Sequence, residues 1–200
     1  MNWTRPSKLF KHIYPRSHWT CWLEQDILFS FDDGPGPQTN SLLDLAEKYG
    51  VKFAFFILPE QAVKYPEIVS RIVKDDHILG SHFLEHRYHI MDTKQVFLNS
   101  LNESVQKIED ISQHSIQYCR IPYGRLLPWQ EKWIDQSGYT HVFWSLDSKD
   151  YNLEPSEKVI NRVRDNIQSD DIVLFHDGEA SHPQIVQIVD ECLKLLDSNS

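Results

Sequence analysis

The sequence predicts an α/β fold built on a parallel sheet, and three observations lead to this prediction. Short apolar runs alternate along the chain with segments of helical periodicity. The runs are apolar at successive positions, as expected of strands that are buried on both faces. With 200 residues, 40% hydrophobic and 24% charged, the chain is long enough for one domain with a sizeable core. Either a barrel or an open doubly wound sheet fits this alternation.

Helix signals separate the predicted strands. Gly50 closes the first helix, because a left-handed cap favours glycine. Pro66 opens the second, since a missing N–H costs nothing in the first turn. The clearest helix spans residues 93–112, where apolar residues recur at three- and four-residue spacing. The six strands are expected at residues 27–31, 51–58, 77–81, 116–122, 139–147 and 171–177, and the six helices at about 40–49, 66–74, 93–112, 129–137, 155–167 and 183–196.

Ionisable residues follow five of the six predicted strands. In both candidate folds, ligands bind at the carboxyl ends of the strands, where the loops converge. These side chains are therefore expected to lie on one rim of the sheet. They are Asp32 and Asp33, His82 and His86, Arg120, Asp147 and Asp150, and His176 and Asp177.

The residue types on this rim favour metal-assisted hydrolysis of an acyl group. Asp32 and Asp33 point to opposite sides as they leave a strand, so they are expected to have two roles. His82 and His86 are spaced so that both rings reach one ion, and one of the carboxylates completes a three-ligand site with open positions. The other carboxylate is then free to take a proton from water. His176 supplies a group that gives a proton to the leaving amine or alkoxide.

Each feature taken alone also has a simpler interpretation. An Asp-Asp pair before Gly-Pro forms turns and helix caps. The chain holds ten histidines, so a His-x-x-x-His spacing also arises by chance. Arg120 alone fits a structural ion pair, and His176 alone fits a buried core histidine. The order and placement of all these residues together favour the catalytic interpretation.

The composition excludes some functional classes. A net charge of −9 argues against nucleic acid as a partner, because such proteins need clustered Lys and Arg. Residues 1–16 are basic and aromatic but lack the apolar core of a signal peptide, and no later run is long enough to span a bilayer. A cytoplasmic location is therefore expected. The three cysteines predict neither a disulfide framework nor a cysteine zinc site.

Five short motifs occur in a fixed order along the chain. They are 31–35 (FDDGP), 82–86 (HFLEH), 120–124 (RIPYG), 147–151 (DSKDY) and 174–176 (LFH). In sequence and in order they resemble the five motifs of the NodB-homology polysaccharide deacetylases, carbohydrate esterase family four. The segments between them are also similar to that family.

This resemblance covers residues 27–196 and implies a distorted, incomplete (β/α) barrel. Residues 1–25 are expected to form an N-terminal arm packed on the barrel. Residues 26–200 are expected to form a single deacetylase-like catalytic domain.

The motif positions also imply a role for each site residue. By resemblance, Asp32 is the general base and His176 the general acid. Arg120 orients Asp32, Asp150 tunes His176, and the backbone N–H of Tyr123 helps hold the oxyanion. The implied metal ligands are Asp33, His82 and His86.

The resemblance implies a metal-dependent hydrolase that removes acetyl groups from N-acetylated or O-acetylated carbohydrate. Zinc is the expected ion, with cobalt, nickel or manganese as alternatives. An N-acetylated sugar or oligosaccharide is the expected partner, and no protein partner is implied. Two alternatives stay open: a hydrolase of another small amide or imide, and a non-catalytic carbohydrate-binding descendant of the fold.

Three features depart from the family pattern. Phe83 stands where the family has Ser or Thr, so no hydroxyl at this position braces the metal loop. Tyr151 replaces the usual Trp and is expected to leave a smaller aromatic wall beside the acetyl group. No apolar segment follows the last predicted helix to form the usual closing strand, so the barrel is expected to have a gap or a borrowed edge.

Overall fold

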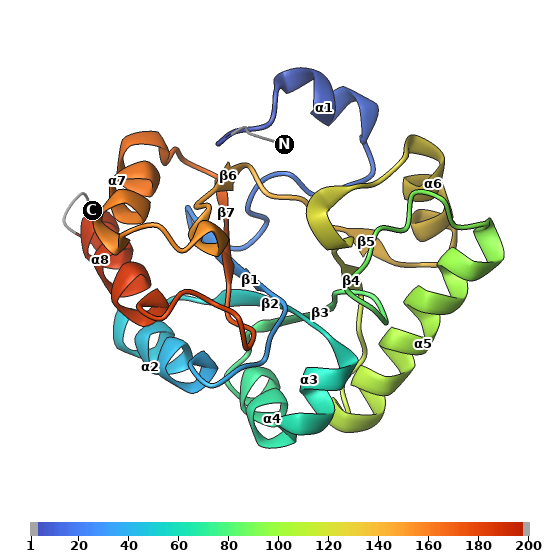
Figure 1. The fold of residues 1–200 in the computed structure, drawn as a ribbon, viewed down its shortest axis with the longest axis horizontal. Coiled ribbons are helices and arrows are strands. Elements are labelled where there is room, and N and C mark those ends of the chain that lie inside the picture. The colour runs from blue at the N-terminus through green and yellow to red at the C-terminus, as the bar shows by residue number, and fades with distance from the viewer. Residues whose placement is uncertain (1–3, 198–200) are drawn as a thin grey trace.

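Seven parallel strands form one curled sheet, the half-open barrel shown in Figure 1. The computed structural model describes residues 4–197. Across the sheet the strand order is β5-β4-β3-β2-β1-β7-β6. The strands are β1 (Leu28–Asp32), β2 (Phe53–Ile57), β3 (Ile78–Ser81), β4 (Tyr118–Cys119), β5 (Thr140–His141), β6 (Leu146–Asp147) and β7 (Ile172–His176). The predicted distorted, incomplete (β/α) barrel is confirmed.

Helices α2 to α8 lie around the outside of the curled sheet (Figure 1). Gly50 ends α2 in the left-handed conformation, with φ 65°, as predicted. The N-terminal cap of α5 is Thr93, whose hydroxyl accepts the N–H of Val96. The helices are α2 (Thr39–Tyr49), α3 (Pro59–Lys64), α4 (Pro66–Lys74), α5 (Lys94–Ser112), α6 (Pro128–Gln136), α7 (Ser156–Asn166) and α8 (Ile185–Asp197), and of these only α3 was not predicted.

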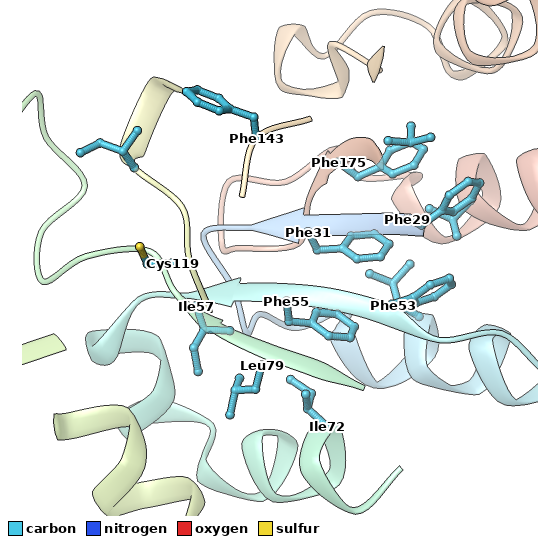
Figure 2. Packing of buried hydrophobic residues seen from close by; sticks show 14 of the residues in the cluster. Phe29, Phe31, Phe53, Phe55, Ile57, Ile72, Leu79, Cys119, Phe143 and Phe175 are labelled. Atoms are coloured by element: carbon cyan, nitrogen blue, oxygen red, sulfur yellow. The ribbon is translucent and has the colours of Figure 1, made fainter. Parts of the chain in front are cut away.

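Side-chain alternation along the strands creates two apolar layers. The outer layer lies between the sheet and the helices, and phenylalanine rings of neighbouring strands fill it (Figure 2). A smaller layer faces the barrel interior and includes Leu28, Phe56 and Ile172. Because side chains of period two share a face, the interior also receives Ser30 and Asp32. The rings of the outer layer come from Phe29, Phe31, Phe53, Phe55 and Phe175.

The prediction of one strand over residues 139–147 is wrong. This stretch contains two short strands at opposite edges of the sheet, β5 beside β4 and β6 beside β7. The chain between them crosses the open side of the barrel. Continuous apolar character predicted burial correctly here, but it does not distinguish one strand from two strands joined by a buried crossing.

The N-terminal arm, defined as residues 4–22, bridges the gap between the two edge strands, β5 and β6. His18 pairs with Val142 just beyond β5, in a parallel bridge. At the other edge, the N–H of Asp147 in β6 donates to the carbonyl of Thr4 at 2.9 Å. Helix α1 (Lys8–Ile13) lies over the gap between these two edges (Figure 1). The barrel therefore borrows its closing edge from the arm.

Aromatic packing holds the arm in place. Trp19 is 7% exposed, and its ring stacks on Phe143 with centroids 4.1 Å apart. Its indole N–H donates to the carbonyl of Tyr14 at 3.0 Å. Tyr14 is also buried, and its hydroxyl donates to the carbonyl of Leu126. Both polar groups have partners, so the two rings are buried without an unpaired donor.

Parts of two predictions lie outside the described residues. Residues 1–3 belong to the predicted arm, and residues 198–200 to the predicted catalytic domain. Within residues 4–197, no helix is both long enough and apolar enough to cross a bilayer.

Trp19→Ala tests how much the arm contributes to stability. Removing this buried ring should lower the free energy of unfolding by about 3–5 kcal/mol, the range for large-to-small changes in a core. Urea denaturation measures this value. Leu9→Ala is the control on the same arm, because Leu9 is 67% exposed and should change stability by less than about 0.5 kcal/mol. A loss below about 1 kcal/mol for Trp19→Ala would show that the arm is not an integral part of the fold.

Candidate active site

A fully buried ion pair lies at the carboxyl end of the central strands. Nη1 of Arg120 donates to Oδ1 of Asp32 at 2.8 Å, and both side chains are buried. Asp32 ends β1 and lies beside His176, the last residue of β7, in the parallel register. The second oxygen of Asp32, Oδ2, lies 3.9 Å from Nε2 of His82. One oxygen is thus held by the arginine while the other faces the site.

Every nitrogen of the Arg120 guanidinium donates a hydrogen bond inside the barrel. Nη1 also donates to Oγ of Ser30 at 2.9 Å, Nε to the carbonyl of Val142 at 3.0 Å and Nη2 to that of Phe143 at 3.1 Å. The guanidinium carbon lies 4.0 Å from the ring centre of Phe56. Burial lowers the pKa of Arg120, and the charge of Asp32 opposes that shift. A buried charge with this many partners is fixed in orientation.

Three side chains converge beside this pair. Oδ1 of Asp33 lies 3.4 Å from Nε2 of His82 and 3.2 Å from Nε2 of His86. This oxygen is buried and has no hydrogen-bond partner among the described residues. Two imidazole nitrogens and one unpaired carboxylate oxygen aimed at the same point form a suitable site for a divalent cation. The residues therefore fit the metal that the sequence predicts.

Burial favours a neutral His82 ring, and its Nδ1 lacks a partner among the described residues. Burial lowers the pKa of His82, which favours the neutral ring that binds metal. Its Nδ1 is buried and has no partner among residues 4–197. Ligand histidines generally donate this second N–H to an acceptor. Weaker support of this loop by the residue at position 83 stays a prediction, and the unpaired Nδ1 of His82 is consistent with it.

Phe83 contributes to the loop through its backbone and its ring. Its N–H donates to Oγ of Ser81 at 3.1 Å, and Ser81 in turn shares a hydrogen bond of 2.7 Å with Ser104. The ring is fully buried against His89 and Phe97, with centroids 4.9 and 5.2 Å away. The hydroxyl that is absent at position 83 is thus partly replaced by the serine two residues earlier.

In each of the first three motifs, one residue that is not glycine adopts a left-handed backbone. These residues are Asp33 with φ 72°, Phe83 with φ 64° and Tyr123 with φ 61°. Such conformations cost about 1–3 kcal/mol each and persist where the surrounding structure enforces them. One lies in each of the first three motifs, so the fold maintains strain at the loops that carry the site.

His176, beside Asp32 at the strand ends, forms a second charged pair at the cavity. Its Nδ1 lies 3.0 Å from Oδ1 of Asp150, and its backbone N–H donates to Oδ2 of the same carboxylate at 2.9 Å. Burial opposes protonation of His176, but the charge and hydrogen bond of Asp150, with weaker effects of Asp33 and Asp32, raise its pKa to about 10. Ser148 donates to Oδ1 of Asp150 at 2.9 Å. At neutral pH this raised pKa favours the protonated, positively charged ring of His176.

A cavity of about 350 Å³ connects these groups. The predicted residues Asp32, Asp33, His82, His86, Tyr123 and His176 line it together with Asp147. The predicted residues Arg120 and Asp150 are fully buried behind it. The structure thus brings every predicted site residue to one place.

Tyr151 and the arm form the walls of this cavity. The Tyr151 hydroxyl donates to Oδ2 of Asp147 at 3.1 Å, and its ring lies edge-on to His176. Burial, followed by the charge of Asp147, raises the pKa of Tyr151. The hydroxyl of Tyr151 thus fixes its ring, which the sequence predicts as a smaller aromatic wall. Pro6, Phe10 and Trp19 of the arm line the cavity as well.

Gly34 of the first motif and Gly36 just after it pack against Asp177. A Cβ at Gly34 would lie 2.2 Å from Oδ1 of Asp177, and one at Gly36 would lie 2.2 Å from its carbonyl oxygen. Oδ2 of Asp177 accepts from Thr39 at 2.6 Å, and burial raises the pKa of Asp177 to about 7. The sequence predicts Asp177 on the rim of the site. In the structure, Asp177 instead packs behind the loop that carries Asp32 and Asp33.

Three serines that hydrogen-bond to residues of the site were not predicted from the sequence. Ser30 bonds Arg120, Ser81 bonds the Phe83 loop and Ser148 bonds Asp150. Ser30 lies two residues before Asp32, so strand periodicity gave a signal that these side chains share a face. The roles of Ser81 and Ser148 depend on loop geometry that no periodicity encodes.

Comparison with known proteins identifies the family. The sequence profile described as polysaccharide deacetylase matches residues 23–142. The chain belongs to the polysaccharide deacetylase family. A peptidoglycan-N-acetylglucosamine deacetylase of Bacillus cereus is 28% identical over 184 residues, covering 92% of this chain and 66% of that protein. A chitooligosaccharide deacetylase of Azorhizobium caulinodans is 28% identical, covering 78% of this chain and 75% of that protein. The resemblance that the five motifs indicate is confirmed.

Solved structures of this deacetylase family share the fold. A peptidoglycan N-acetylglucosamine deacetylase, crystallised with 4-naphthalen-1-yl-N-oxidanyl-benzamide, superposes with a TM-score of 0.87 at 25% identity. That match covers 97% of this chain and 92% of the other. The family 4 carbohydrate esterase PdaA of Bacillus subtilis also gives a TM-score of 0.87, at 20% identity, over 100% of this chain and 92% of that structure.

Asp150→Asn tests the electrostatic control of His176. Removing the neighbouring negative charge should lower the pKa of His176 from about 10, so its ring should lose its proton at lower pH than in the unchanged protein. NMR titration of the histidine ring signals in metal-free protein measures this shift. Asp165→Asn, a surface change on α7, should leave the titration unaltered. Identical titration curves for Asp150→Asn and the unchanged protein would disprove the coupling.

Proposed function

We propose that this chain is a metal-dependent deacetylase that hydrolyses the acetamido group of an N-acetylated sugar. The observation that carries the proposal is the division between two neighbouring carboxylates. Asp32 is bound to Arg120 and presents one free oxygen, while Asp33 faces His82 and His86. A proton acceptor beside a three-residue cation site is the arrangement that metal-assisted hydrolysis needs.

The protein residues supply the proton transfers. Oδ2 of Asp32 takes a proton from the water that attacks the acetyl carbon, and Arg120 orients the carboxylate through its other oxygen. When the C–N bond breaks, His176 gives its proton to the departing amine, and Asp150 stabilises the ring before the transfer. Asp32 and His176 lie beside each other in the strand register, so the proposed base and acid can both act at the C–N bond of the same acetamido group. The products are acetate and the free amino sugar.

Charge on the carbonyl oxygen needs separate stabilisation. A divalent ion held by Asp33, His82 and His86 would polarise the acetyl carbonyl and make the attacking water more acidic. The backbone N–H of Tyr123 is the proposed second donor to that oxygen. The left-handed backbone of Tyr123, with φ 61°, fixes the direction of this N–H. Zinc is the proposed ion, because the donor set combines two imidazoles with one carboxylate.

An N-acetylated oligosaccharide is the proposed substrate class. The cavity lining combines aromatic rings with a few polar groups, as ligand sites commonly do. Relatives are named for acting on peptidoglycan N-acetylglucosamine and on chitooligosaccharide. Acetate release from chitooligosaccharides, peptidoglycan fragments and acetylated xylan, together with metal analysis, tests the class and separates N-acetyl from O-acetyl substrates.

Asp32→Asn and Asp33→Ala separate the proposed roles. Asp32→Asn keeps the shape of the side chain but cannot accept a proton, so turnover should fall roughly a hundredfold or more with the metal retained. Asp33→Ala removes a charged ligand, so metal affinity should fall and excess metal should partly restore activity. Acetate release and metal content of the same preparations measure both effects.

Two outcomes would contradict these roles. Loss of metal from Asp32→Asn with full retention by Asp33→Ala would reverse the assignment of the two aspartates. Unchanged acetate release in both variants would show that neither aspartate takes part in the deacetylation. If the unchanged protein releases no acetate from any substrate, the deacetylase proposal fails and a non-catalytic carbohydrate-binding protein remains.

A further inference from the structure

Two exposed tyrosines stack on each other at the mouth of the cavity. The rings of Tyr88 and Tyr123 lie 4.4 Å apart between centroids, with 28° between their planes. Tyr88 is 56% exposed and Tyr123 is 47% exposed, and both line the cavity. The Tyr123 ring is also 4.4 Å from the ring of His86. The pair thus forms an aromatic platform, and its Tyr123 ring contacts His86, one of the proposed metal ligands.

The fold does not use this platform for its own packing. Neither ring belongs to the hydrophobic core clusters. Within residues 4–197, neither phenol oxygen has a hydrogen-bond partner. Exposed aromatic surface of this size is unfavourable in water, and beside a cavity it is typical of a ligand contact.

The loop that carries Tyr88 is braced on both sides of it. Arg87 makes a two-point contact with Asp92, with Nη–Oδ distances of 2.9 and 3.0 Å. Nδ1 of His89 lies 2.8 Å from the same carboxylate. Gln130 at the start of α6 donates to the carbonyl of His89 at 2.8 Å. The side chains before and after Tyr88 are held, so its exposed ring is presented in a fixed position.

We propose that Tyr88 and the Tyr123 ring form a sugar-stacking subsite for the pyranose ring linked to the one that loses its acetyl group. This inference rests on the proposed function and specifies its substrate as a chain of at least two sugar rings. One face of a pyranose ring carries C–H groups, which pack favourably on the electron-rich face of an aromatic ring. The contact between Tyr123 and His86 brings the platform next to the reacting group, within reach of the adjoining ring.

Tyr88→Ala tests the subsite by comparing substrates of different length. For N,N′,N″-triacetylchitotriose, KM should rise roughly tenfold, the scale of a lost aromatic contact, with kcat changed little. For N-acetylglucosamine and ethyl acetate, kcat/KM should stay unchanged, because neither places a second ring on the platform. Tyr88→Trp keeps a flat ring and should restore the KM for the trisaccharide.

Met91→Ala is the matched control. Met91 is on the same loop, is 89% exposed and does not line the cavity, so its loss should leave all three substrates unaffected. An unchanged KM for the trisaccharide in Tyr88→Ala would overturn the subsite. An equal loss on all three substrates would also overturn it, because the ring would then only support the Tyr123 backbone.

A binding measurement separates this inference from the proposed function. Calorimetric titration of metal-free protein with N,N′,N″-triacetylchitotriose should show roughly tenfold weaker binding for Tyr88→Ala. If this loss is found and the unchanged protein releases no acetate from any sugar, the subsite is supported and the deacetylase proposal fails. If acetate is released and trisaccharide binding is equal in both proteins, the subsite fails and the deacetylase proposal stands.

Discussion

The buried ion pair between Arg120 and Asp32 is the interaction on which the rest of the site depends. The two side chains lie inside the barrel, where an unpaired charge would be strongly destabilising. The arginine uses its remaining donors on Ser30 and on backbone carbonyls, so it cannot turn away from the aspartate. Asp32 is thereby held apart from the cation site while Asp33 faces it. Adjacent carboxylates can then have different roles.

The parallel sheet turns this local pairing into a catalytic arrangement. Asp32 and His176 are register partners at the ends of β1 and β7, so the proposed base and acid are fixed by backbone hydrogen bonds. The proposed metal-binding side chains come instead from the loops after β1 and β3, where packing enforces the left-handed backbone of Asp33 and Phe83. On one side the N-terminal arm closes the barrel gap and lines the cavity, and on the other the Tyr88–Tyr123 platform borders it.

Local signals in the sequence predicted much of this structure. Apolar runs identified the strands, Gly50 and Pro66 marked helix ends, and five ordered motifs identified the family and the residues of the site. What failed depends on contacts between distant segments. The split of residues 139–147 follows from an open barrel side that the arm fills, and the bracing of Phe83 by Ser81 follows from loop geometry. Tyr88 lies outside every motif, and only the fold places its ring on Tyr123.

The most direct test of the separate roles of the two aspartates is a crystal structure of the zinc-loaded protein with anomalous diffraction at the zinc edge. We expect one zinc peak, bounded by the Asp33 carboxylate and the Nε2 atoms of His82 and His86, with Asp32 still paired to Arg120. A zinc ion bound by the Asp32 carboxylate in place of Asp33, or an Asp32 side chain released from the arginine, would contradict it.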